Sequence, residues 1–170
     1  MVTNTITEAQ VWALLAQVND PEVPVLSVLD LGIVRNVTVR LTANDNATEE
    51  VTVTITPTYT GCPATDLIAM NIRLALLQAG IPKVTIQTVL SPAWTTDWIT
   101  PSGAAKLKAY GIAPPVGKSL DEAYLEDITV PCPRCGSNHT QLLSAFGSTA
   151  CKALYQCSDC KEPFDYFKCH

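Results

Sequence analysis

The sequence has little positive charge and no long apolar run, and each shortage excludes a class of protein. Lys and Arg number 11 against 16 Asp and Glu, which gives a formal net charge of −5. An acidic chain repels a phosphate backbone, so we expect no nucleic-acid partner. No apolar stretch reaches the roughly 18 residues of a transmembrane helix, so we expect no membrane span.

A secretory signal is also lacking, because Glu8 and Gln10 interrupt the N-terminal segment where an apolar stretch would be needed. We therefore expect a cytoplasmic protein. Seven cysteines in a reducing compartment indicate metal or thiol chemistry rather than disulfides. With 170 residues, of which 47% are hydrophobic, the chain is long enough for one ordinary domain and a small second one.

Apolar spacing along the first part of the chain predicts the order α-β-β-α-β-α, and hence an α+β fold. Thr5 and Glu8 stand at capping-box spacing ahead of the first amphipathic helix. The later elements are expected as strands over 37–41 and 51–55, a helix over 63–79, a strand over 84–90 and a short helix over 102–109. The long helix is apolar on most sides, so we expect it to be well buried.

The composition changes after Pro114-Pro115, and six of the seven cysteines lie in the last 39 residues. A proline pair is typical of a linker. We predict a domain over residues 1–112, a linker over 113–130 and a small second domain over 131–170.

The second domain contains two pairs of cysteines with the same spacing. Cys132 and Cys135 form one pair, Cys157 and Cys160 form the other, and 21 residues separate them. Two thiolates at this spacing hold one side of a tetrahedral ion, and the second pair completes its shell, so the pattern predicts a zinc ribbon. A segment of about 40 residues cannot bury enough surface to fold alone, so the metal would supply much of the folding free energy.

Other interpretations of these cysteines stay open. Redox-active pairs are one, although the surroundings lack the strand and helix of a thioredoxin motif. Iron could replace zinc in the same cage. Cys151 could substitute for one ligand, or both it and Cys169 could pack inside the ribbon. His139 and His170 are either additional ligands or ordinary surface residues.

Cys62 is the only cysteine in the first 131 residues, and it stands between Gly61 and Pro63 at the start of the long helix. Free backbone amides and the helix dipole favour a thiolate there. Such a thiolate could ligate iron, pair with a second protomer's thiolate or attack an electrophile. The alternative is a small residue packed under the loop. No histidine lies nearby in the sequence, which disfavours a cysteine-histidine hydrolase.

Three motifs together resemble the iron–sulfur assembly domain shared by SufT-type and cytosolic cluster-targeting proteins. They are Asp20-Pro21-Glu22, Asp30-Leu31-Gly32-Ile33-Val34 and Gly61-Cys62-Pro63-Ala64, and the resemblance covers about residues 5–100. Segments 91–98 and 110–115, followed by the four-cysteine ribbon, are similar to the PaaD family. Members of that family are accessory proteins, also described as subunits, of the bacterial phenylacetyl-CoA epoxidase system.

The resemblance implies a maturation role rather than catalysis. A protein of this kind would help to assemble or insert iron–sulfur clusters during aerobic phenylacetate degradation. Its partners would be the epoxidase's reductase, which carries flavin and a 2Fe–2S cluster and is the expected client, and its di-iron oxygenase subunits. By position, Cys62 would be the reactive cysteine, and Asp20, Glu22 and Asp30 belong to the motif. Many relatives carry Asp-Pro-Gly before the cysteine, whereas this chain has Thr58-Tyr59-Thr60-Gly61, which puts in doubt any metal site that needs an aspartate there.

The leading hypothesis is therefore a non-enzymatic accessory factor. Cys62 would hold iron or a cluster transiently, across a possible homodimer, while the ribbon recognises the client. The alternatives are a structural subunit of the oxygenase complex, a thiol enzyme that uses Cys62, and, last, a nucleic-acid-binding ribbon. Asp20 and Asp30 could also simply cap turns.

Overall fold

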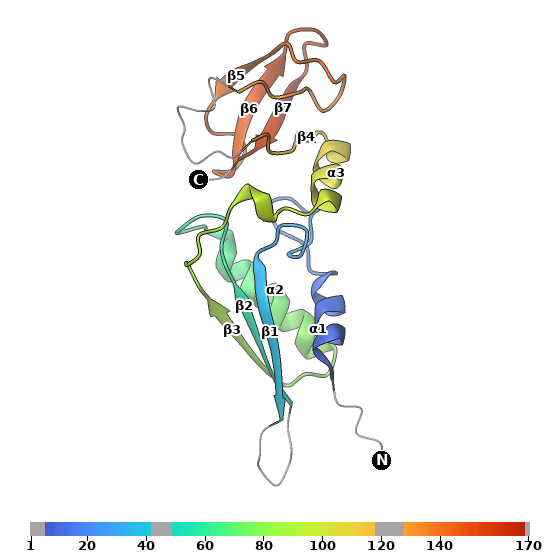
Figure 1. Ribbon diagram of the computed structural model, residues 1–170, viewed down its shortest axis with the longest axis vertical. Coiled ribbons are helices and arrows are strands. Elements are labelled where there is room, and N and C mark those ends of the chain that lie inside the picture. Colours follow the sequence, from blue (N-terminus) through green and yellow to red (C-terminus); the bar gives the residue numbers. More distant parts are fainter. Residues whose placement is uncertain (1–5, 42–48, 118–127, 169–170) are drawn as a thin grey trace. The chain divides into compact units, whose positions relative to one another are not determined.

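The computed structural model describes residues 6–41, 49–117 and 128–168. Its contacts divide the chain into two compact units, Met1–Trp94 and Thr95–His170. The first unit combines two helices with a three-stranded sheet, and the second contains a four-stranded sheet (Figure 1). The expected α+β class is confirmed.

The sheet of the first unit has the order β1-β2-β3. Its strands are β1 (Val34–Leu41), β2 (Glu49–Ile55) and β3 (Lys83–Thr88). β1 pairs with β2 in antiparallel register, and β2 pairs with β3 in parallel. Because side chains alternate along a strand, Val37, Val51 and Val53 are buried on one face. A row of paired threonines, Thr52 between Thr38 and Thr85, is out of phase with these valines and lies on the opposite face.

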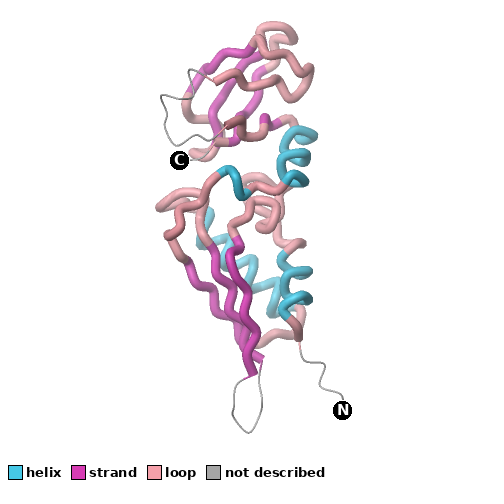
Figure 2. The backbone as a smooth tube through the Cα atoms, viewed as in Figure 1, coloured by secondary structure: helices cyan, strands magenta, loops and turns pink. Residues whose placement is uncertain are grey.

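Two helices cover the apolar face of this sheet. α1 (Glu8–Leu15) packs against β1 and α2, and α2 (Ala64–Gln78) packs against β3 (Figures 1 and 2). The capping box of α1 consists of Thr7 and Gln10, each side chain bonded to the other residue's backbone amide. The expected partner Glu8 is instead the first residue of the helix, and Thr5 lies outside the described residues.

The expectation that the long helix is well buried was wrong. One face of α2 is buried, through Ala64, Ile68, Ile72 and Leu76. Large apolar side chains nevertheless lie exposed on the helix, and these are Leu67, Met70, Leu74 and Leu77. A sheet of three strands offers α2 one layer to pack on, so apolar residues on its other side meet no described part of this unit.

The second unit begins with helical turns and continues into a sheet of order β4-β7-β6-β5. Its elements are η1 (Thr96–Trp98), α3 (Pro101–Tyr110), β4 (Ile112–Ala113), β5 (Thr140–Ser144), β6 (Lys152–Cys157) and β7 (Pro163–Phe167). β4 pairs with β7 in parallel, and the other neighbours are antiparallel. The core is built on Tyr155, whose ring stacks on Phe164 at 5.9 Å between centroids and meets Tyr166 edge-on at 5.6 Å.

The predicted short helix corresponds to α3. The Thr100 side chain accepts a hydrogen bond from the Gly103 amide at its start, and Gly111 ends it with a φ of 92°. The contacts group this helix and β4 with the second unit. The predicted division into 1–112, a linker over 113–130 and 131–170 stays a prediction. Within the part of the chain that the structure describes, no helix is long and apolar enough to cross a membrane.

Candidate metal centre

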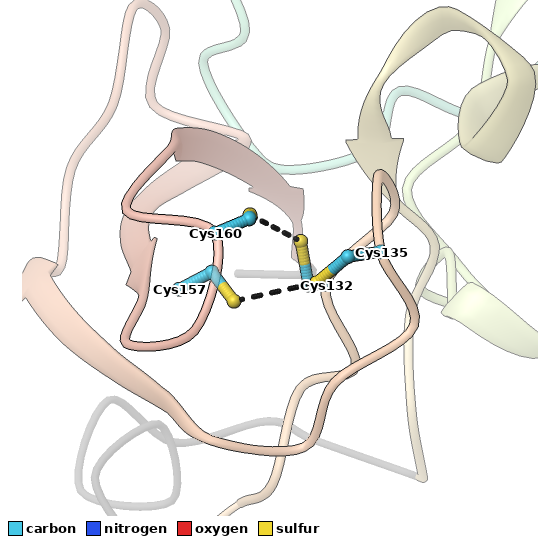
Figure 3. Close-up of side chains that lie close together, drawn as sticks. All are labelled: Cys132, Cys135, Cys157 and Cys160. Atoms are coloured by element: carbon cyan, nitrogen blue, oxygen red, sulfur yellow. Dashed lines mark hydrogen bonds between the residues drawn. The ribbon is translucent and has the colours of Figure 1, made fainter.

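Four cysteine sulfurs converge at one end of the second unit's sheet (Figure 3). The Sγ atoms of Cys132, Cys135, Cys157 and Cys160 all lie within 4.8 Å of one another. Cys132 and Cys160 are separated by 3.8 Å between sulfurs, and Cys135 and Cys157 by 3.6 Å. A tetrahedral zinc ion with Zn–S bonds of about 2.3 Å needs sulfurs about 3.8 Å apart. The predicted ligand set therefore fits a divalent ion held by four thiolates.

The two cysteine pairs sit on turns with the same backbone. The Cys132 amide donates to the Ser137 carbonyl at 2.9 Å, and the Cys157 amide donates to the Glu162 carbonyl at 3.0 Å. The residue after each second cysteine has a positive φ, 77° at Gly136 and 63° at Lys161. Because the turns repeat, each presents its two sulfurs in the same way. Lys161 takes the left-handed conformation although a side chain disfavours it.

The charges at this centre call for a cation. The backbone amide of Cys160, followed by that of Asp159, lowers the pKa of the Cys157 thiol to about 6. At Cys135 the Ser137 amide favours the thiolate, but desolvation and the hydrogen bonds among the sulfurs outweigh it and raise the pKa to about 12. The pKa of Cys160 is also raised, because desolvation and the Cys157 sulfur outweigh the Glu162 amide. Four thiolates thus do not coexist at neutral pH unless a positive ion compensates them.

Polar side chains outside the sulfur cluster join the two turns, a feature that the sequence did not predict. Asp159, between the cysteines of the second pair, accepts a hydrogen bond from the Ser137 hydroxyl. It also lies against the ring of His139, and the bonds from Ser137 and then His139 lower the pKa of Asp159. The Ser158 amide donates to the His139 carbonyl at 2.7 Å. His139 is thus placed beside the centre and is not among its four converging ligands.

Cys151 does not join the cluster either. It is buried, and its sulfur lies 3.1 Å from the Thr149 hydroxyl, while its carbonyl accepts from the Lys168 amide at 2.9 Å. These contacts match the packing role that the sequence left open. The other two candidates, Cys169 and His170, lie outside the described residues.

Cys62 lies in the turn that leads into α2, and its side chain is half-buried. Its amide donates to the Tyr59 carbonyl at 3.2 Å, and its carbonyl accepts from the Thr65 amide at 3.1 Å. Gly61 has a φ of 83°, and a Cβ there would meet no atom within 4 Å. The glycine is therefore required for backbone conformation rather than for space, and it turns the chain so that Cys62 precedes the helix.

The motif aspartates are buried in the loop between α1 and β1, where each organises a turn. One oxygen of Asp20 accepts from the Glu22 and Val23 amides at 2.8 and 2.7 Å. One oxygen of Asp30 accepts from the Ser27 amide and hydroxyl at 2.9 and 2.8 Å. These bonds are those expected of turn caps. Trp94 reinforces this loop, since its buried ring donates from Nε1 to the Leu31 carbonyl at 2.8 Å.

Among the described residues, the ribbon cysteines are the one set of three or more His, Cys, Asp or Glu side chains that converge as metal ligands would. Cys62, Asp20, Glu22 and Asp30 do not form a second such set. Their assignment to iron or cluster handling stays a prediction.

Comparisons with known proteins match both units. Residues 8–89 match the family described as iron–sulfur cluster assembly protein, and residues 118–168 match the PaaD zinc beta ribbon domain. The chain is 52% identical, over 94% of its length and 92% of the relative's, to a protein of Escherichia coli K12 named putative 1,2-phenylacetyl-CoA epoxidase subunit.

Two further similarities are confined to part of the chain. It is 35% identical to a Porphyromonas gingivalis protein named Fe-S protein maturation auxiliary factor, over 59% of this chain and 90% of that one. A crystal structure of a DUF59 domain of unknown function from Bacillus anthracis shares the fold, with a TM-score of 0.50 and 24% identity over 59% of this chain and 90% of that one. With both units matched and the identity spanning nearly the whole length, the chain belongs to the PaaD family of the phenylacetyl-CoA epoxidase system and joins an iron–sulfur assembly domain to a zinc ribbon.

Proposed function

We propose that this chain is an accessory maturation factor of a bacterial phenylacetyl-CoA epoxidase, and that it helps to assemble or insert the iron–sulfur cluster of the reductase component. One observation carries the proposal. A protein 52% identical over nearly the full length is named as a subunit of that epoxidase, and this chain carries an iron–sulfur assembly domain as its first unit. The chain itself would not oxidise the substrate.

Cys62 is the residue we assign to the cargo. Its sulfur is half-buried in a turn at the amino end of α2, where helix amides and dipole favour negative charge. One thiolate supplies a single ligand, whereas a cluster usually takes four. Thiols of the donor or the client would complete the shell, which suits a handover rather than storage. Asp20 and Asp30 would act by holding the neighbouring loop in shape, because their oxygens accept bonds from its backbone.

The ribbon would hold zinc and recognise the client. The separations between its sulfurs, 3.6 and 3.8 Å in two of the pairs, support a four-thiolate ion, and zinc is the usual occupant of such a closed site. A bound zinc would supply no redox chemistry, so it would fix the ribbon's shape. The free thiols of the described cysteines also support a reducing compartment, which we infer to be the cytoplasm.

The test is maturation of the reductase in cells that co-express it with this chain. Wild type is compared with Cys62→Ser and with the matched control Cys151→Ser, which alters a cysteine outside the ribbon's ligand set. The readouts are iron and acid-labile sulfide in the purified reductase. We expect Cys62→Ser to leave the reductase with little cluster and Cys151→Ser to load it normally. A fully loaded reductase with Cys62→Ser would refute the proposal.

A structural subunit is the second candidate, and the relative's name, which calls it a subunit, favours it. Here the metal only folds the ribbon, and the chain would hold the oxygenase complex together. That function predicts stable, stoichiometric co-purification with the oxygenase subunits, unaffected by Cys62→Ser. A maturation factor would instead be recovered in sub-stoichiometric amounts.

A further inference from the structure

The long helix of the first unit carries an apolar stripe that the proposed function does not use. Leu67, Met70, Leu74 and Leu77 are 41%, 58%, 51% and 45% exposed, while the opposite face of the helix is buried. Their spacing of three, four and three residues places all four on one side of α2, as the a and d positions of a heptad. We propose that this stripe binds the same stripe of a second copy of the chain, with the two helices antiparallel.

The spacing itself selects a second copy. The sequence of steps three, four, three reads the same in both directions, so a two-fold axis beside Ile72 maps the stripe onto itself. Leu67 then lies opposite Leu77 of the partner subunit, and Met70 lies opposite Leu74 of the partner subunit. Each apolar side chain meets another, which is the self-complementary contact that a two-fold dimer requires. A flat or irregular partner would leave the regular ridge without matching grooves.

The charges beside the stripe select the antiparallel direction. Asp66 and Arg73 are both exposed and each precedes a leucine of the stripe, so they lie seven residues apart on the same flank. Antiparallel pairing sets this flank against its own copy and brings opposite charges together. Parallel pairing would set it against the flank of Asn71 and Gln78, with no charge to match. Antiparallel helix dipoles also attract rather than repel.

The extent of the stripe sets the strength of the pair. Two short helices packed along four such residues each bury on the order of 1,000 Å² in total, at the lower end of the range for specific interfaces. The dimer is therefore weak and depends on concentration. Each α2 is 15 residues long, which corresponds to about 22 Å. The two Cys62 residues stand at opposite ends of the pair, so the dimer carries two separate cysteine sites rather than one shared cluster.

Sedimentation of the full metal-loaded chain over a range of concentrations tests the proposal. Wild type is compared with Leu74→Glu and with the matched control Leu90→Glu, since Leu90 is 55% exposed and lies off α2. We expect wild type to pass from monomer to dimer as its concentration rises, Leu74→Glu to raise the dissociation constant at least about tenfold, and Leu90→Glu to behave as wild type. A wild type that is monomeric throughout, or a dimer unaffected by Leu74→Glu, overturns the proposal. Unchanged thermal unfolding of each variant shows that the fold is retained.

A charge swap tests the direction. Asp66→Arg and Arg73→Asp should each weaken the dimer, because each creates a like-charge contact across the antiparallel interface. The double variant should restore wild-type association, because the two charges face each other and are exchanged. If the double variant is as weak as the single ones, the antiparallel arrangement is wrong.

Discussion

The Nδ1 atom of His139 lies 3.2 Å from Oδ2 of Asp159, and this contact joins the two cysteine turns from outside the sulfur cluster. His139 follows the first pair of cysteines, and Asp159 lies between those of the second. The Ser137 hydroxyl bonds to the same carboxylate. The turns are thus held together by polar side chains as well as by any bound ion, an arrangement that orients the ligands in metal sites.

Loss of this link should speed the release of metal. In Asp159→Ala the Ser137 and His139 side chains lose their acceptor, so we expect metal transfer to a chromogenic chelator to be several-fold faster. Asp159→Asn keeps one acceptor oxygen and should lie between. Glu162→Ala removes a charge at an exposed neighbouring position and serves as the control. Equal rates for Asp159→Ala and Glu162→Ala would assign the effect to charge alone.

Removal of the metal should unfold the ribbon and leave the first unit folded. Cys132 and Cys157 belong to the same buried cluster as Tyr155 and Tyr166, so repulsion or solvation of the sulfurs would disrupt the aromatic packing. We expect a strong chelator to abolish the near-ultraviolet circular dichroism of these tyrosines. Buried Trp94, in the first unit, should keep its fluorescence maximum. Tyrosine signals that survive complete metal loss would contradict a metal-dependent ribbon.

The sequence predicts the ribbon ligands well because two cysteine pairs at fixed spacing have few structural solutions. The contact of Asp159 with Ser137 could not be predicted in the same way. The two residues are 22 positions apart, and each is an ordinary turn residue until the turns are brought together. No signal in the sequence singles out this pair.

The long helix illustrates a different limit. Its leucines, isoleucines and methionine predict a helix, and its bounds were found to within one residue at each end. Which of its faces is buried depends on how wide the sheet is, and the spacing of Leu67 and Leu74 does not contain that information. Asp30 shows the reverse case, because the turn-cap alternative followed from local chemistry and the structure places its oxygen on the Ser27 amide.

Metal affinity should rise with pH. The pKa values of Cys135 and Cys160 are raised, so both thiols are protonated at pH 7 in the metal-free ribbon and each must lose its proton on binding. Cys157, with a pKa of about 6, adds a proton only below that pH. We therefore expect the logarithm of the binding constant to increase by at least about two per pH unit near pH 7. Chelator competition at several pH values measures it, and a pH-independent constant would contradict the assigned thiol states.

Replacement of Asp30 should destabilise the first unit without touching the metal centre. Its buried carboxylate holds the Ser27 amide and hydroxyl, and the Ser27 hydroxyl in turn accepts from the Asp30 amide at 3.0 Å. In Asp30→Ala the Ser27 amide loses its partner inside the protein, which should lower the free energy of unfolding by about 2 kcal/mol. Asp30→Asn keeps one acceptor and should lose less, while Cys62→Ser, outside this network, should unfold as wild type does. Urea unfolding of the three variants measures the order. If Asp30→Ala were as stable as wild type yet failed to mature the reductase, the carboxylate would act on the cargo rather than on the loop.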